Sequence, residues 1–279
     1  MSSVTFILQE TLEAALIISL LLVIGFSCAI KNRWLFYGLG LGIVGACIYA
    51  YNMKAISECF DYVGQELTNA FIQISIVLLI GSYAFLICAF FIPRLHGIFH
   101  KSVDKKLNEK LYSFVACNIV ALGIILEGSE ILVYLNGFFQ QNEVFPAVIL
   151  GSSIGFGLGL SIGIILYYTL ANLPPRWRLT IPFILLGIFA GNMASQAALQ
   201  LTQADWLPYT PVLWNSSTII SESSVTGRLL YALFGYEATP SLAQALAYAA
   251  GVTLVLIIIY TRRKIFCAGS KALDLSITP

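Results

Sequence analysis

The sequence predicts an all-α protein that crosses a lipid bilayer with about seven helices. Of its 279 residues, 58% are hydrophobic and only 10% are charged, whereas a soluble domain carries about a quarter charged residues. Apolar runs of roughly 20 residues, the length that spans the hydrocarbon core of a bilayer, recur between short polar breaks. The predicted spans are residues 4–30, 34–52, 67–92, 112–138, 145–171, 179–200 and 241–261.

The positive charges in the breaks predict the orientation of the chain, because loops rich in lysine and arginine stay in the cytoplasm. Basic residues follow the first, third, fifth and seventh spans, for example in the run 262–264. The other breaks are mainly acidic and hold only Lys54 and Arg228 as basic residues. We therefore expect a multi-pass cell-membrane protein with its N-terminus outside and its C-terminus in the cytoplasm. The compact chain favours a bacterial inner membrane.

The whole chain, 1–279, is predicted to form a single transmembrane domain. Its longest break, 204–240, is expected to be an outer loop with a short interfacial helix at 225–236, and 241–279 holds the last span and a cytoplasmic tail. Glycines recur in the spans 34–52 and 145–171. Small residues at such spacing let helices approach closely, so we expect packing seams there.

Four glutamates lie inside predicted spans, where ionisable groups are costly and mark functional sites. Glu10 and Glu13 in the first span, and Glu127 and Glu130 in the fourth, form two Glu-x-x-Glu motifs. Residues three apart share one face of a helix. Four carboxylates with no lysine or arginine nearby in sequence cannot all stay ionised in a low dielectric, so they need a cation, protons or water. Alternatively, they are independent protonated groups bonded to neighbouring helices.

The two motifs are predicted to lie at similar depths, roughly 10 to 15 Å below the outer surface at ~1.5 Å per residue. If the two helices are neighbours, Glu10 faces Glu130 and Glu13 faces Glu127. The motifs are three spans apart, so 1–92 and 93–203 would be inverted three-helix repeats, a common transporter plan with the site between the halves. A cluster of carboxylate oxygens suits a hard cation.

Other polar residues are weaker candidates for an ion pathway. Asn192 and Gln196 share a face of the sixth span, and together with Gln9 they either line a route or bond neighbouring helices. His96 and His100 are four apart and could bind a metal leaving on the inner side if that loop is helical, although an ordinary interfacial loop explains them better. The acidic residues that would attract cations on the outer side include Asp61, Glu66 and Glu222.

The motifs QETLEAALI and LEGSEILVYL resemble the Arg-Glu-x-x-Glu motifs in the first and fourth spans of the oxidase-dependent iron permease family. Residues 213–248 are similar to that family's Leu-Trp-Asp segment with its later Gly-Tyr and Pro-Ser, so the likeness covers nearly the whole chain. The resemblance implies a seven-helix transporter that imports iron ions, with iron as the transported substrate and no other cofactor. It also implies that the four glutamates are metal ligands, and that a separate oxidase or metal-delivery protein is a partner on the outer face.

The sequence departs from the family's pattern, since Gln9 and Leu126 stand where the motifs have arginine. Losing both arginines leaves the carboxylates with less positive compensation, which favours bound protons or a bound cation. Transport of another divalent cation such as manganese, or the role of a non-conducting membrane assembly subunit, stays open. An enzyme is not expected, because the sequence has no His-Glu-x-x-His motif and no histidine within a predicted span to serve as a ligand or base. The net charge of +1 implies no nucleic-acid partner, and the apolar spans predict membrane lipid as the surroundings of the chain.

Overall fold

The computed structural model describes residues 3–88, 105–139, 141, 143–175 and 177–277, and within these ranges the regular structure is helical. Seven of the helices are long and apolar enough to cross a bilayer, which confirms the predicted multi-pass membrane fold. They are α1 (Ser3–Ser27), α2 (Arg33–Tyr51), α4 (Gly64–Leu86), α6 (Lys105–Phe138), α7 (Phe145–Ala171), α8 (Thr180–Gln203) and α10 (Leu242–Ile277). Two shorter helices are α3 (Met53–Ser57) and α9 (Val225–Phe234).

Most helix boundaries agree with the hydrophobic pattern. The helix α7 begins and ends where the sequence predicts, whereas α6 begins at Lys105 and not near 112. Its first turns are rich in lysine and glutamate, which are good helix formers, so the helix continues beyond the apolar segment. The helix α10 likewise extends to Ile277, past its apolar window Leu242–Thr261.

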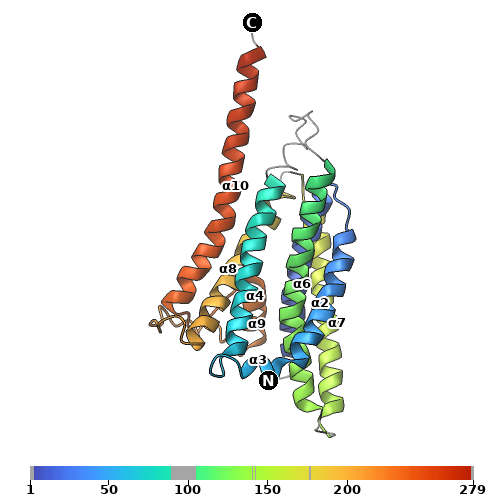
Figure 1. Ribbon diagram of the computed structural model, residues 1–279, viewed down its shortest axis with the longest axis vertical. Helices are drawn as coiled ribbons and strands as arrows, with labels where there is room; N and C mark the ends of the chain where they lie inside the picture. The colour runs from blue at the N-terminus through green and yellow to red at the C-terminus, as the bar shows by residue number, and fades with distance from the viewer. Residues whose placement is uncertain (1–2, 89–104, 140, 142, 176, 278–279) are drawn as a thin grey trace.

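The chain runs up and down through the bundle, so that its two ends lie on opposite sides (Figure 1). We call the side that carries Ser3 the N-terminal face and the opposite side the C-terminal face. The helices α1, α4, α7 and α10 run toward the C-terminal face, whereas α2, α6 and α8 return from it.

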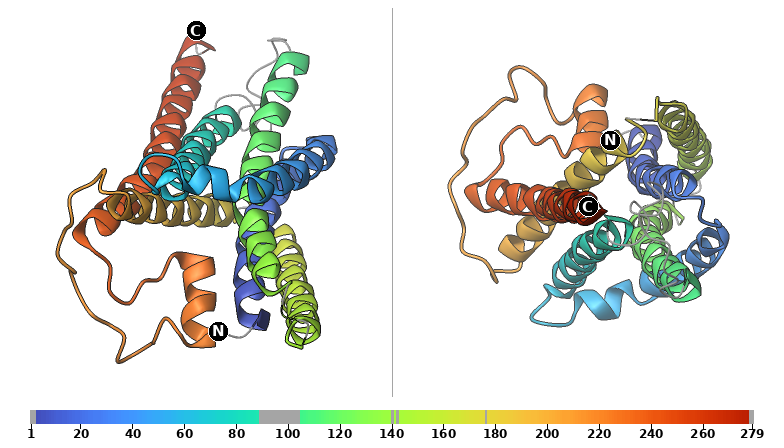
Figure 2. Two further views of the ribbon diagram at one scale, coloured as in Figure 1. Left: turned by 60° about the horizontal axis from the view of Figure 1, so that its bottom comes forward. Right: turned by 90° about the horizontal axis from the view of Figure 1, so that it is seen from above.

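The helices pack in preferred pairs. The most extensive contacts join α1 to α7 and α2 to α6, followed by α8 with α10 and α4 with α8. The helix α1 is the most buried of the seven, whereas α2 and α7 lie at the periphery (Figure 2). Large apolar side chains such as Phe36 on α2 and Ile164 on α7 are exposed, as expected for surfaces in contact with lipid.

Glycines allow the two closest helix pairs to form, as the sequence predicts. A Cβ atom at Gly155 of α7 would overlap the carbonyl oxygen of Val4 in α1, and one at Gly42 of α2 would lie 2.7 Å from Ile124 of α6. By contrast, Gly157 of α7 has open space around its Cβ position. The seams are therefore formed by particular glycines on one face of each helix.

The segment 204–241 closes part of the N-terminal face. It contains α9, which is capped at its start by the Ser224 hydroxyl and ends at Gly235 with a φ of 67°. The helix α9 packs against α1 and α8 (Figure 2). A Cβ atom at Gly235 would lie 2.8 Å from Oδ1 of Asn192 in α8, so the end of α9 fits directly onto the bundle.

Candidate functional site

The structure brings the glutamates of the two motifs together. Glu10 and Glu13 of α1 and Glu127 of α6 are 3%, 2% and 6% exposed, and Glu130 is half-buried. The carboxyl groups of Glu10 and Glu127 lie within hydrogen-bonding distance of each other. We call Glu10, Glu13, Glu127 and Glu130 the carboxylate cluster.

The pairing within the cluster is shifted from the register that equal depths suggest. Glu10 forms its hydrogen bond with Glu127, whereas Glu130 interacts with Glu10 only through its charge. The C-terminal end of α6 projects beyond the N-terminus of the chain (Figure 1), so equal distances from the helix ends are not equal depths. Glu13 and Glu127 line one common pocket.

Side-chain amides surround Glu13. Nε2 of Gln196 lies 3.4 Å from Oε2 of Glu13 and 3.3 Å from Oδ1 of Asn192, and the Gln9 side chain lies close enough to Glu13 to interact with its carboxyl group. All three amides that the sequence indicates therefore lie beside the cluster. The contact between Gln196 and Glu13 also joins α8 to α1. The positions of these amides are therefore compatible both with lining an ion pathway and with holding the two helices together.

Two amides of α4 complete this polar layer, although the sequence analysis did not select them. Asn69 and Gln73 are each 2% exposed. Gln73 donates to Oε1 of Gln196 at 2.9 Å, and Asn69 accepts from the Tyr49 hydroxyl at 2.7 Å. The signal that could have identified them is the shared Asn-x-x-x-Gln pattern of α4 and α8.

The helix α9 brings a positive charge to the cluster. Arg228 lies close enough to Glu10 for their charges to interact, because α9 packs on α1. Its Nε atom is buried and has no hydrogen-bond partner. Tyr231, one turn further along α9, lies within electrostatic reach of Glu10 and Glu13.

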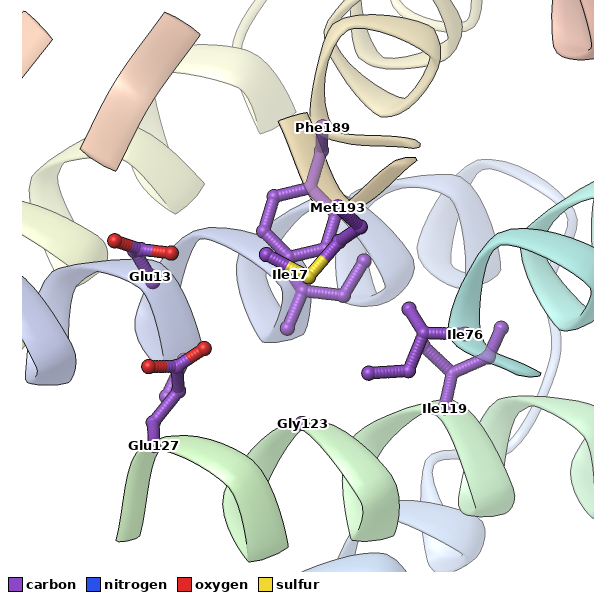
Figure 3. Close-up of a pocket in the computed structure, with 9 residues that line it drawn as sticks. Glu13, Ile17, Ile76, Ile119, Gly123, Glu127, Phe189 and Met193 are labelled. Carbon is purple, nitrogen blue, oxygen red and sulfur yellow. The ribbon is translucent and has the colours of Figure 1, made fainter. Parts of the chain in front are cut away.

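An apolar plug closes the bundle on the C-terminal side of the cluster. It consists of side chains from α1, α4, α6 and α8 that are at most 4% exposed: Ile17, Ile76, Ile119, Phe189 and Met193. Figure 3 shows these side chains on one side of the pocket and Glu13 and Glu127 on the other. The pocket between them has no room for a water molecule.

The cluster offers carboxylate oxygens, and the amides beside it offer carbonyl oxygens; both kinds of donor suit hard cations. Within the described ranges, no three side chains of His, Cys, Asp or Glu are arranged in a geometry that could hold a metal ion. The Glu10–Glu127 hydrogen bond instead satisfies the two carboxyl groups with each other. A cation that enters the cluster must therefore displace this bond or recruit the amide oxygens.

The acidic residues predicted to attract cations on the outer side are dispersed. Asp61 is exposed in the loop between α3 and α4, and Glu66 is half-buried in the first turn of α4 with its Oε2 atom lacking a hydrogen bond. Glu222 accepts a hydrogen bond from the backbone N–H of Ala238 at 2.6 Å, so it stabilises the segment 204–241. His96 and His100 lie outside the described residues.

Comparison with known proteins places the whole chain in one group. The sequence model of the Iron permease FTR1 family matches residues 1–270. The ferrous iron permease EfeU of Escherichia coli O6:H1 is 25% identical over 248 residues, which is 85% of this chain and 87% of the relative. EfeU of Shigella sonnei is 25% identical over 247 residues with the same coverage, and EfeU of Shigella flexneri is 28% identical over 130 residues, 45% of this chain and 54% of the relative. No solved structure matches the chain.

Proposed function

Because the chain belongs to the iron permease FTR1 family, and so to transporters and not enzymes, we propose that it imports iron through the carboxylate cluster. The observation that carries the proposal is the close approach of Glu10 and Glu127 from two different helices in the interior of the bundle. The ferrous iron permeases to which the chain is similar make Fe²⁺ the proposed ion.

The cluster would exchange protons for the cation. A hydrogen bond between two carboxyl groups requires a proton on one of them, so a cation bound between Glu10 and Glu127 replaces that proton. Glu13 and Glu130 add two further carboxylates within electrostatic reach. This exchange stabilises the buried site in both the empty and the loaded state, because neither state leaves four unpaired negative charges in a low dielectric.

The apolar plug supports a transport cycle in which a cation can reach the carboxylate cluster from only one side of the membrane at a time. With the plug closed, a cation reaches the cluster only from the N-terminal face, which we propose is the outer face because the basic breaks lie at the other end. Release into the cytoplasm requires the plug helices α1, α4, α6 and α8 to separate.

An inverted repeat would supply that movement. If 1–92 and 93–203 are equivalent halves, the pair α1–α7 corresponds to the pair α6–α2, and α4 packs on its own counterpart α8. The observed helix pairs follow this reciprocal pattern, and the glycine seams occur in both pairs. Rocking of one half against the other then changes the side from which the cluster is open.

The segment 204–241 would be the contact surface for a metal-delivery protein or oxidase at the outer face. Its aromatic side chains Trp206, Tyr209 and Trp214 are exposed. Aromatic residues are enriched at protein interfaces as well as at the membrane surface. This partner is a secondary part of the proposal, because Fe²⁺ itself needs no oxidation to bind carboxylates.

Reconstituted protein gives a direct test. Liposomes that contain the purified chain should accumulate radioactive Fe²⁺ under anaerobic conditions, and Glu127→Gln should abolish uptake while the protein stays folded. Glu143→Gln, which alters an exposed glutamate between α6 and α7, should transport normally. Parallel assays with Fe³⁺ and Mn²⁺ identify the preferred ion.

The same assays separate the alternatives. Uptake of Mn²⁺ in preference to iron would establish a different divalent-cation transporter. Absence of both binding and transport of every ion, together with stoichiometric co-purification of another membrane protein, would replace the proposal by an assembly role.

A further inference from the structure

The helices α4 and α8 carry the same pair of amides at the same spacing. Asn69 and Gln73 lie on α4, Asn192 and Gln196 lie on α8, and the two helices pack against each other. Asn69, Gln73 and Asn192 are 2%, 2% and 3% exposed. Such buried amides in a membrane helix either join helices or bind a ligand.

The hydrogen bonds of this group leave two polar atoms without partners. Gln73 donates to Gln196 at 2.9 Å, and Nε2 of Gln196 lies 3.4 Å from the Glu13 carboxylate. The carbonyl Oε1 of Gln73 and the Nδ2 atom of Asn192 are buried and accept or donate no hydrogen bond. A simple clasp between helices would not need to leave a buried carbonyl oxygen unsatisfied.

The hydrogen bond between Gln73 and Gln196 lies next to the apolar plug, and this position indicates a role for the unbonded Oε1 atom of Gln73. Along α4, Gln73 lies one turn before Ile76, and along α8, Gln196 lies one turn after Met193. Because the two helices run in opposite directions, both amides lie just on the N-terminal side of the apolar plug. The amide bridge between Gln73 and Gln196 is thus the last polar layer that a cation would meet before the plug.

We propose that Gln73 and Gln196, together with the Glu13 carboxylate, form a second cation site between the carboxylate cluster and the plug. Its ligand is a hard divalent cation, bound by the carbonyl oxygens of the two amides and one carboxylate oxygen, the donor set that such cations prefer. Rotation of the Gln196 amide frees its Oε1 atom from Gln73 and turns it toward the ion. This inference rests on the proposed transport function and adds a second binding site to the ion pathway.

Equilibrium binding of Fe²⁺ to the full chain under anaerobic conditions tests the site. Gln73→Met keeps the length of the side chain but removes both polar atoms, so Fe²⁺ affinity should fall by about tenfold to a hundredfold. Gln73→Glu supplies an oxygen and a negative charge, so it should bind Fe²⁺ at least as tightly as the unaltered chain. Asn118→Leu is the matched control, because this amide of α6 donates only to Phe114 of its own helix, and binding should not change.

The outcomes separate this inference from the proposed function. Binding that requires Glu127 but is unaffected by Gln73→Met overturns the second site and leaves the carboxylate cluster in place. Equal losses in Gln73→Met and Gln73→Glu would show a structural clasp and would also overturn it. No Fe²⁺ binding by the unaltered chain contradicts the proposed function itself. If Gln73→Met fails to fold, Gln73→Asn replaces it, since the shorter amide should weaken binding while keeping the polar group.

Discussion

Glu10 of α1 and Glu127 of α6 meet through their carboxyl groups in the interior of the bundle. The contact joins two helices that belong to different halves of the proposed repeat. We therefore expect the contact to stabilise the fold as well as to form the centre of the proposed ion site. Substitutions here must separate these two roles.

Glu127→Gln and Glu127→Ala should differ in stability but not in transport. The glutamine amide can still donate to Glu10, whereas alanine leaves a buried carboxyl group without a partner, which costs about 1–3 kcal/mol. Thermal unfolding in detergent, followed by tryptophan fluorescence, should show a clearly lower midpoint for Glu127→Ala. Both variants should lose iron uptake. Equal midpoints would mean that the Glu10–Glu127 contact does not stabilise the bundle.

Arg228→Gln should move the pH dependence of iron uptake toward higher pH. A positive charge beside Glu10 favours an ionised carboxylate through Coulomb attraction. Without it, protons compete with the cation up to a higher pH, by about half a pH unit or more, since 1.36 kcal/mol corresponds to about one unit. Arg228→Lys should keep the original profile, and so should Arg178→Gln near the opposite face. An unchanged profile in Arg228→Gln would remove this arginine from the site.

Gly155→Ala should destabilise the protein, whereas Gly157→Ala on the same helix should not. The new methyl group at 155 meets the backbone of Val4 in α1, but at 157 it enters open space. Overpacking of this kind costs about 1–3 kcal/mol. The two unfolding midpoints in detergent measure the difference. Similar midpoints would indicate that α7 does not depend on this close approach to α1.

Glu237 should make the stability of the segment 204–241 depend on pH. Burial raises the pKa of Glu237, and nearby Glu222 raises it further, against the hydrogen bond from Gln244. Because the pKa of this acid is higher in the folded than in the unfolded chain, its contribution to stability is present at low pH. It is lost as the pH rises through the folded-state pKa.

Glu237→Gln removes this titration. Its unfolding midpoint relative to the unaltered chain should therefore rise between pH 4.5 and pH 7.5. Glu143→Gln provides the comparison at an exposed position. A constant difference across this pH range would show that Glu237 does not titrate with folding.

The hydrophobic pattern predicts the helices well because lipid imposes the length of each span. The start of α6 could not be predicted from runs of apolar residues, because its first turns are charged, although they are compatible with a helix. The pairing of α1 with α7, and not with its neighbour in sequence, depends on which glycine faces which helix. That information arises only when the helices pack.

The candidate site was predictable to the extent that its residues are charged and lie inside spans. The four glutamates met this condition, whereas Asn69 and Gln73 are neutral and did not stand out in an apolar run. Arg228 was visible only as a loop charge, because its place beside Glu10 requires α9 to fold back onto α1. The pairing of Glu10 with Glu127 likewise depends on how far α6 projects beyond α1. The spacing of the motifs in the sequence does not determine this projection.

The voltage across a membrane falls mainly over regions that hold no water, because water and ions screen the field elsewhere. In the described part of the bundle, the plug of Ile17, Ile76, Ile119, Phe189 and Met193 has no room for water beside Glu13 and Glu127. A potential of about 100 mV is worth about 2.3 kcal/mol per charge, so a doubly charged ion gains about twice that in crossing the plug. In the proposed orientation the negative cytoplasm attracts the ion across this short dry layer. The electrical potential then gives transport its direction, independently of the iron gradient.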